Sequence, residues 1–371
     1  MSPEELLEMP AGSPPPGQQS NLKDPPNLET AGRAVLLFFW ISASTLFLLR
    51  MYTKLFVIRK VKLSDYSIIL AWGIFMGYFA PAWLLSKVGP GVDQWNISLK
   101  NFISLLFYFH VASIMYGCCI FFIKLAILLQ ILEVFVPLKS NNYFFWSCHA
   151  LIWINFVFYT ISFFLEIFSC RPMDKVWNIL ITEGTCLDTT KLNIAASSIN
   201  AASDVVILVL PQLRIWGLHM PLHKKIAVSA VFFVGIFACV SSVVRLAYTV
   251  HLYQTDNKSY YSYLAGVWTL PELASGIIVA CLPVIPRFVR SVDPNNRLSR
   301  LGASVQELLS TVTGGSRQRS RESSRNTAKG QGDGTVVMPT GKGSESDQYP
   351  LVAMSSQASS RKDAIATKGV T

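Results

Sequence analysis

The sequence predicts an all-α, polytopic membrane protein built as a bundle of seven transmembrane helices. The first observation is composition: 51% of the 371 residues are hydrophobic and only 15% are charged, which is too apolar for a soluble domain of this length. The second is that the apolar residues form stretches of about 20, the length a helix needs to cross roughly 30 Å of hydrocarbon. These stretches are continuously apolar, whereas the strands of a membrane barrel alternate polar and apolar residues.

The apolar stretches divide the chain into an arm, a membrane domain and a tail. Residues 1–33 include three consecutive prolines and no apolar core of signal-peptide type, so we expect a disordered extracellular arm. Residues 291–371 are rich in Ser, Gly and Arg and predict a disordered, basic cytoplasmic tail. Residues 34–290 hold the seven predicted helices, at 34–53, 66–86, 102–132, 143–169, 192–215, 226–250 and 263–288.

Basic residues between the helices predict the orientation of the bundle. Arginine and lysine are concentrated in segments 50–65, 214–225 and 287–300, and such loops are usually cytoplasmic. The N-terminus is therefore expected outside and the C-terminus inside. The outer side then carries Asn96, which begins a glycosylation sequon. It also carries Cys170 and Cys186, which we expect to form a disulfide in an oxidising compartment, with two free thiols as the alternative.

Two serines of the tail have the surroundings of phosphorylation sites. Ser320 and Ser324 each follow an arginine by three residues, and phosphorylation there would lower the local positive charge. Attraction of a basic tail to anionic lipid explains the same residues, and we favour that interpretation.

Three ionisable residues, Asp204, Arg245 and Glu272, fall inside predicted helices. Each costs about 2.5 to 3.5 kcal/mol to insert at membrane depth, so each suggests a function. Asp204 shares one helix face with Asn193, Ser197 and Asn200, which recur at helical spacing. We expect a polar cavity open to the outside, with Arg245 paired to Glu272 or Asp204. The predicted ligand-binding residues are Asn200, Asp204, Arg245, Trp268 and Glu272.

A structural role for the same polar residues remains open. Buried polar side chains also tie membrane helices together, at roughly 0.6 to 2 kcal/mol each. For the charged trio, the cavity and the clamp are equally well supported by the sequence. Lys124 and Glu166 lie near predicted helix ends, where we expect their side chains to reach the membrane interface. His110 and His149 are expected to be hydrogen-bonded structural residues.

Common signatures of soluble enzymes are missing from the sequence. It contains no HExxH, no CxxC pair, no P-loop and no GxSxG. We therefore expect no metal, no cofactor and no nucleic-acid partner. An intramembrane enzyme built on carboxylates stays open.

The chain resembles a known family through residues spread along the membrane domain. They are Arg50, Tyr52 and Lys54 before KLSDY at 62–66, Tyr116 before FFIKLAILL at 121–129, Cys170-Arg171-Pro172, Trp177, Gly184-Thr185-Cys186, Asn200, Asp204, Arg245, Trp268, Glu272 and ACLP at 280–283. In this order they resemble the fungal rhodopsin-domain family, which includes satratoxin-cluster and Pth-type receptor-like proteins. The resemblance implies a receptor-like or metabolite-handling membrane protein of a filamentous fungus, with the charged trio as part of the family pattern.

Departures from better-known seven-helix proteins narrow what the resemblance implies. The stretch 263–288 contains no lysine, so a retinal Schiff base cannot form there. Neither a DRY nor an NPxxY pattern is present, and the arm has no cysteine-rich module.

Two hypotheses of function follow from the sequence. The first is a sensor in the plasma membrane or an endomembrane, which binds an unidentified small extracellular or metabolite ligand and acts on a cytoplasmic signalling partner. The second is an accessory membrane protein of secondary metabolism, a cyclase, isomerase or carrier, in which Asp204 or Glu272 supplies acid catalysis. We rank the sensor above the enzyme, and a transporter third, because no inverted repeat is evident.

Overall fold

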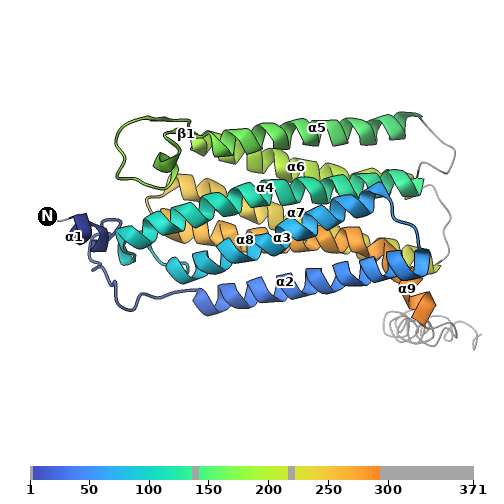
Figure 1. The fold of residues 1–371 in the computed structure, drawn as a ribbon, viewed down its shortest axis with the longest axis horizontal. Coiled ribbons are helices and arrows are strands. Elements are labelled where there is room, and N and C mark those ends of the chain that lie inside the picture. Colours follow the sequence, from blue (N-terminus) through green and yellow to red (C-terminus); the bar gives the residue numbers. More distant parts are fainter. Residues whose placement is uncertain (1–2, 136–141, 216–221, 293–371) are drawn as a thin grey trace, which may run out of the picture. The chain divides into compact units, whose positions relative to one another are not determined.

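The computed structural model describes residues 3–135, 142–215 and 222–292, and seven long helices run side by side through them (Figure 1). All seven are long and apolar enough to cross a membrane, so the predicted fold class and an integral membrane location are confirmed. The predicted basic tail from residue 293, with Ser320 and Ser324, lies outside the described residues. The helices are α2 (Glu29–Tyr52), α3 (Leu63–Val88), α4 (Leu99–Phe135), α5 (Asn142–Ile167), α6 (Thr189–Ile215), α7 (Leu222–Gln254) and α8 (Lys258–Cys281).

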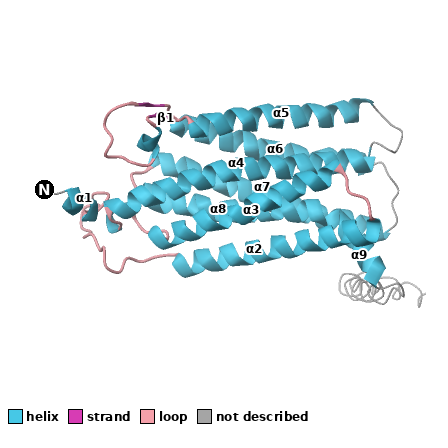
Figure 2. Ribbon diagram, viewed as in Figure 1, coloured by secondary structure: helices cyan, strands magenta, loops and turns pink. Residues whose placement is uncertain are grey.

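Short elements occupy the two ends of the bundle (Figure 2). One end carries α1 (Pro3–Glu8), η2 (Gln94–Asn96), η4 (Met173–Val176) and the strands β1 (Cys170–Arg171) and β2 (Thr185–Cys186). At the other end α2 continues as the π-helical η1 (Thr53–Ile58), and α8 continues through η5 (Leu282–Val284) into α9 (Ile285–Val292). We call these the hairpin end and the α9 end.

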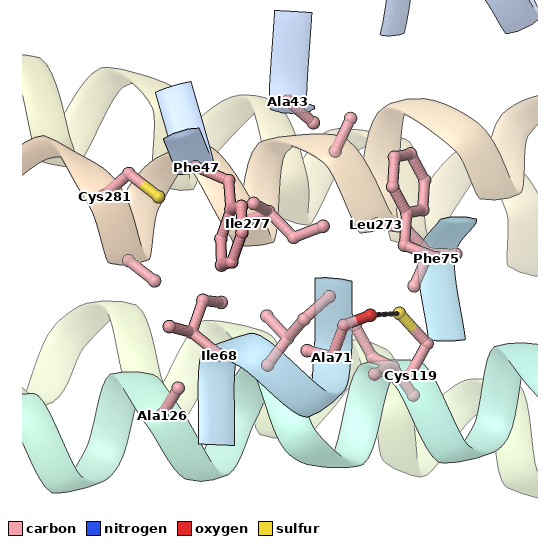
Figure 3. Packing of buried hydrophobic residues seen from close by; sticks show 14 of the residues in the cluster. Ala43, Phe47, Ile68, Ala71, Phe75, Cys119, Ala126, Leu273, Ile277 and Cys281 are labelled. Carbon is pink, nitrogen blue, oxygen red and sulfur yellow. Dashed lines mark hydrogen bonds between the residues drawn. The ribbon is translucent and has the colours of Figure 1, made fainter. Parts of the chain in front are cut away.

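The apolar core lies where α2, α3, α4 and α8 meet (Figure 3). Lipid is as apolar as leucine, so small residues that let helices approach closely are favoured at such contacts. Ala43 and Ala71 are fully buried there, and the Cys119 thiol donates to the Ala71 carbonyl at 3.3 Å. A Cβ added at Gly276 would lie 2.6 Å from Ile123 Cγ2. The sequence therefore needs glycine where α8 crosses α4.

A two-stranded hairpin follows α5 at the hairpin end. β1 and β2 pair antiparallel, with Cys170 opposite Cys186, and the two cysteines form the predicted disulfide. Gly184 has φ +98°, and a Cβ there would collide with the Arg171 carbonyl, so the turn into β2 requires glycine. Between the strands, the ring of Trp177 lies 5.2 Å from that of Phe107 on α4. The disulfide-tied loop thus packs on the bundle.

The N-terminal arm differs from the disordered segment that its composition predicts. The Ala11 N–H donates to the Ile97 carbonyl at 2.9 Å, and the Leu99 N–H donates to the Met9 carbonyl at 2.9 Å. The Leu28 N–H also donates to the carbonyl of Pro90, at 2.7 Å. Composition describes what a segment can bury alone, whereas here the segment between α3 and α4 supplies the hydrogen-bond partners.

The predicted glycosylation site lies under this arm. Asn96 is only 9% exposed, and its Oδ1 accepts the backbone N–H of Asn21 at 2.9 Å. A glycan on Asn96 would therefore require the chain around Asn21 to move away.

A buried ionic cluster, which we call the closed cluster, holds the α9 end together. The Arg50 guanidinium lies 2.6 Å from Asp65 Oδ1, and Lys54 Nζ lies 2.9 Å from Asp65 Oδ2. Arg50 also donates to Gln130 Oε1 at 2.9 Å and to the Ala280 carbonyl. The sequence predicts Arg50 and Lys54 to be loop bases, but helix continues through Ile58 and both side chains are buried.

Candidate ligand-binding site

A cavity of about 170 Å³ lies among the seven helices in the half of the bundle nearer the hairpin end. Its walls are mainly aromatic and aliphatic side chains and come from all seven long helices. α6 and α8 begin at the hairpin end, whereas α5 and α7 finish there, so the lining residues farthest from that end form the cavity floor. The floor residues include Tyr116, Gly117, Tyr159, Asn200, Arg245 and Leu270.

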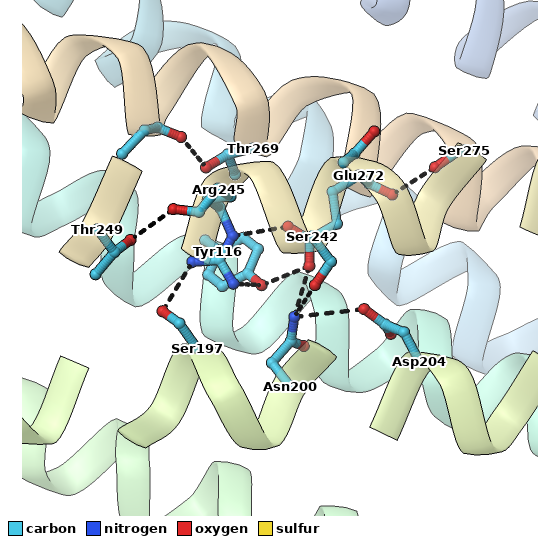
Figure 4. A network of polar contacts seen from close by, with 12 residues as sticks. Tyr116, Ser197, Asn200, Asp204, Ser242, Arg245, Thr249, Thr269, Glu272 and Ser275 are labelled. Carbon is cyan, nitrogen blue, oxygen red and sulfur yellow. Dashed lines mark hydrogen bonds and ion pairs between the residues drawn. The ribbon is translucent and has the colours of Figure 1, made fainter. Parts of the chain in front are cut away.

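Arg245 brings the main positive charge to this floor. Its Nε donates to Glu272 Oε2 at 2.7 Å, and a terminal nitrogen donates to the Tyr116 hydroxyl at 2.8 Å (Figure 4). The Tyr116 hydroxyl in turn donates to Glu272 Oε1 at 2.8 Å. Glu272 is only 1% exposed and does not line the cavity. Of the two partners that the sequence allowed for Arg245, the structure pairs it with Glu272.

Asn200 connects the floor to four neighbouring helices. Its side-chain amide donates to Glu272 Oε1 at 2.7 Å and to the Ser242 hydroxyl at 3.0 Å. Its Oδ1 accepts the Tyr159 hydroxyl at 2.6 Å and Lys124 Nζ at 2.8 Å. An asparagine fits here because its amide can donate and accept at once, which leucine cannot do.

Lys124 and Asp204 form a second ion pair below the floor. Lys124 Nζ lies 2.9 Å from Asp204 Oδ1 and also donates to the Asn200 carbonyl at 3.0 Å. The expectation that Lys124 reaches the membrane interface is wrong, because its side chain is 2% exposed. α4 continues to Phe135, so Lys124 lies about 16 Å from the end of its helix.

We call Tyr116, Lys124, Asn200, Asp204, Arg245 and Glu272 the floor network. Two cations face two carboxylates. Asn200 joins the two pairs through its bonds to Glu272 and Lys124, whereas Tyr116 bonds to both members of the Arg245–Glu272 pair. Such compensation is what a buried charge needs in a medium without water. Chemically, the network presents guanidinium, amide and phenol groups to the cavity and keeps both carboxylates behind them.

The model for the fungal rhodopsin domain matches residues 49–291 of this chain. The chain belongs to the fungal rhodopsin domain family. The whole floor network, the closed cluster and the disulfide fall inside the matched residues, as the resemblance had indicated.

Relatives of this fungal rhodopsin domain protein carry different kinds of name. It is 30% identical over 355 residues to the Fugralins biosynthesis cluster protein 2 of Gibberella zeae, an alignment covering 92% of this chain and 88% of the relative. It is 34% identical to an SAT4 family membrane protein of Emericella nidulans, over 55% of this chain and 51% of the relative. It is 25% identical to the Receptor GIN3 of Arthrobotrys oligospora, over 64% of this chain and 57% of the relative.

Other predicted residues of this family member lie in different surroundings. Trp268 is half-buried and is not among the residues that line the cavity. Glu166 lines the cavity near the hairpin end, and its Oε1 lies 3.6 Å from His110 Nδ1. His110 also approaches Trp177, with ring centroids 5.9 Å apart. His149 lies beside Phe145 instead, away from the cavity lining.

The sequence did not identify four partners in the site: Tyr116, Lys124, Tyr159 and Ser242. A signal existed for two of them. Lys124 is an ionisable residue inside an apolar stretch, and Tyr116 belongs to the family pattern. Tyr159 and Ser242 carried none, because single hydroxyls are common in membrane helices.

Proposed function

We propose that this fungal rhodopsin domain protein is a receptor-like sensor that binds a small ligand in the cavity. One observation carries the proposal: Arg245 and Asn200 line the cavity and also bond to side chains of α4, α5, α7 and α8. A ligand that bonds to either side chain competes with bonds between helices. Binding would therefore change the relative free energies of two helix arrangements, which is what a sensor requires.

The proposed direction of sensing takes the hairpin end as the outer side. A disulfide forms and persists in an oxidising compartment, and the Cys170–Cys186 bridge lies at this end. Arg59, Lys60 and Lys62, which are all exposed, lie in the link between η1 and α3 at the α9 end. An excess of such residues marks the cytoplasmic side. The ligand then enters from outside, and the α9 end faces a signalling partner.

A role in secondary metabolism is the second candidate, favoured by the name of the Gibberella zeae relative. In that role the cavity would hold an apolar intermediate. The two predicted acids argue against catalysis, because neither Asp204 nor Glu272 lines the cavity and each is paired with a cation. A substrate in the cavity would meet Arg245 and Asn200 first. We therefore rank a sensor above an enzyme.

Deleting the gene in the native host separates these two functions. The deletion strain is complemented with wild-type protein or with Arg245→Lys, which keeps a cation beside Glu272 but loses the guanidinium fork. A sensor predicts altered transcription without one accumulating intermediate, restored by wild-type protein and not by an equally abundant Arg245→Lys protein. Accumulation of one intermediate, which wild-type membranes convert to product, would establish the metabolic function instead.

A further inference from the structure

We infer that the cavity takes a neutral, ring-sized ligand that carries a hydrogen-bond-accepting oxygen and binds through Arg245. The inference rests on the proposed function and specifies the class of ligand for that site. Three properties of the cavity support it: its size and walls, the unused donors of Arg245, and the balance of charge around it.

Size and walls select a small, largely apolar ligand. The volume of about 170 Å³ is close to that of an engineered apolar protein cavity of roughly 150 Å³ that holds benzene. Five large apolar side chains line the cavity: Leu36, Phe109, Phe158, Phe163 and Leu270. A single ring with a short substituent fits such a space.

Arg245 offers donors that the protein does not use. A guanidinium has five N–H groups on three nitrogens. Each nitrogen donates one hydrogen bond to a described residue: Nε to Glu272, and the two terminal nitrogens to Ser197 and Tyr116. One N–H on each terminal nitrogen is left. The bond to Ser197 is long, at 3.4 Å. The side chain is only 10% exposed and lines the cavity, so a ligand oxygen on the floor would complete its hydrogen bonding.

The charge around the cavity excludes an anion. Arg245 is already neutralised by Glu272, and Lys124 by Asp204. Glu166 adds a further carboxylate to the lining. A carboxylate ligand would thus lose the water that stabilises its charge and enter a region where acids already outnumber lysine and arginine.

A cationic ligand is also disfavoured. Its natural partner is Glu166, which lies about two helical turns beyond Tyr159 along α5, toward the hairpin end. Glu166 already has His110 as a neighbour at 3.6 Å. An amine bound there would leave the free N–H groups of Arg245 on the floor without an acceptor. A neutral carbonyl, ether or epoxide oxygen accepts from these N–H groups without adding a charge to the cavity.

Four benzene derivatives of similar size test this inference on the purified full chain in lipid nanodiscs. Acetophenone supplies a neutral oxygen, ethylbenzene supplies none, benzoate is an anion and benzylamine is a cation. We expect acetophenone to bind about tenfold more tightly than each of the others, the effect of one hydrogen bond to a charged group. Arg245→Lys should reduce its advantage over ethylbenzene to within about threefold, because an ammonium lacks the guanidinium fork.

Two glycine variants separate cavity binding from partition into lipid. Gly117 lines the cavity and Gly73 does not, and a Cβ at either position meets no atom within 4 Å. Gly117→Leu should therefore fill the floor and abolish binding of acetophenone. Gly73→Leu adds the same side chain on exposed α3 surface and should leave binding unchanged.

If benzoate or benzylamine binds as tightly as acetophenone or more tightly, and Gly117→Leu abolishes that binding, the cavity is a binding site but the inferred ligand class is wrong. If none of the four compounds shows binding that Gly117→Leu abolishes, the inference is overturned as well. The ranking in the wild-type protein needs no variant, so poor folding of Arg245→Lys leaves the test decisive. The deletion-strain experiment judges the sensor independently, because it uses no added ligand.

Discussion

The membrane domain buries two groups of ionic side chains, the floor network and the closed cluster, and they differ in two respects. The floor network balances two cations with two carboxylates and borders a cavity. In the closed cluster Arg50 and Lys54 both pair with one carboxylate, that of Asp65, and none of the three residues lines the cavity. Gln130 and the Ala280 carbonyl accept two further hydrogen bonds from Arg50. Buried charge thus borders a cavity in the floor network, whereas at the α9 end it joins helices away from any part of that cavity.

The largest effect is expected from breaking the closed cluster. Asp65→Ala leaves two buried cations without their shared carboxylate, and loss of one partner from a buried pair costs about 3 to 5 kcal/mol. We expect a sharply lower melting temperature and yield of folded protein. Lys191→Ala is the control, because Lys191 pairs with Asp188 at 3.0 Å but is 86% exposed. Asp65→Ala protein as stable as this control would contradict the role given to the closed cluster.

The disulfide is expected to stabilise the hairpin end by a similar but smaller amount. Cys170 and Cys186 are separated by 16 positions, and a loop of that length predicts roughly 3 kcal/mol on loop-entropy grounds. The double Cys170→Ser, Cys186→Ser variant should release the loop around Trp177, which limited proteolysis between residues 172 and 185 would detect. Unchanged cleavage would mean that the contact of Trp177 with Phe107 holds the loop without the bridge.

A double-mutant cycle sharpens the account of the floor network. Lys124→Gln and Asp204→Asn each break the same ion pair, so their effects on unfolding free energy should be non-additive by about 1 to 3 kcal/mol. Combining Lys124→Gln with Lys191→Ala should instead give additive effects. Additivity within the Lys124–Asp204 pair would show that the observed 2.9 Å contact contributes no coupling.

The smallest effect concerns the arm over Asn96. The bond from the Asn21 N–H is one hydrogen bond, worth about 1 kcal/mol, yet it occupies the predicted glycosylation site. Removing residues 1–27 should raise the glycosylated fraction at Asn96, measured by mass before and after enzymatic deglycosylation. Asn96→Gln provides the baseline without a glycan. Equal occupancy with and without the arm would refute competition between the arm and the glycan.

The sequence predicted the membrane fold well because length and hydropathy determine it directly. Seven apolar stretches became seven helices, and two cysteines in one loop became a disulfide. Helical spacing also placed Asn200 and Asp204 on one face, and insertion cost marked Arg245 and Glu272.

Pairing between helices was harder to predict, because it depends on rotation and depth that one sequence does not specify. Lys124 was assigned to the interface from its predicted distance to a helix end, although it pairs with Asp204. Arg50 and Lys54 were counted as loop bases for a similar reason. Trp268 shares a helix face with Glu272 by spacing but does not line the cavity. Composition predicts a disordered arm because it carries no information about the arm's partner, the segment from Pro90 to Leu99.

The central claim is that the cavity above the floor network is the sensing site. Its most direct test compares host strains that express Gly117→Leu and Gly73→Leu at equal protein levels. Transcription is measured against the deletion strain and the wild-type strain. We predict that Gly73→Leu restores the wild-type profile, whereas Gly117→Leu leaves the deletion profile. A wild-type profile in the Gly117→Leu strain would contradict the claim, because a filled cavity would then still support the function.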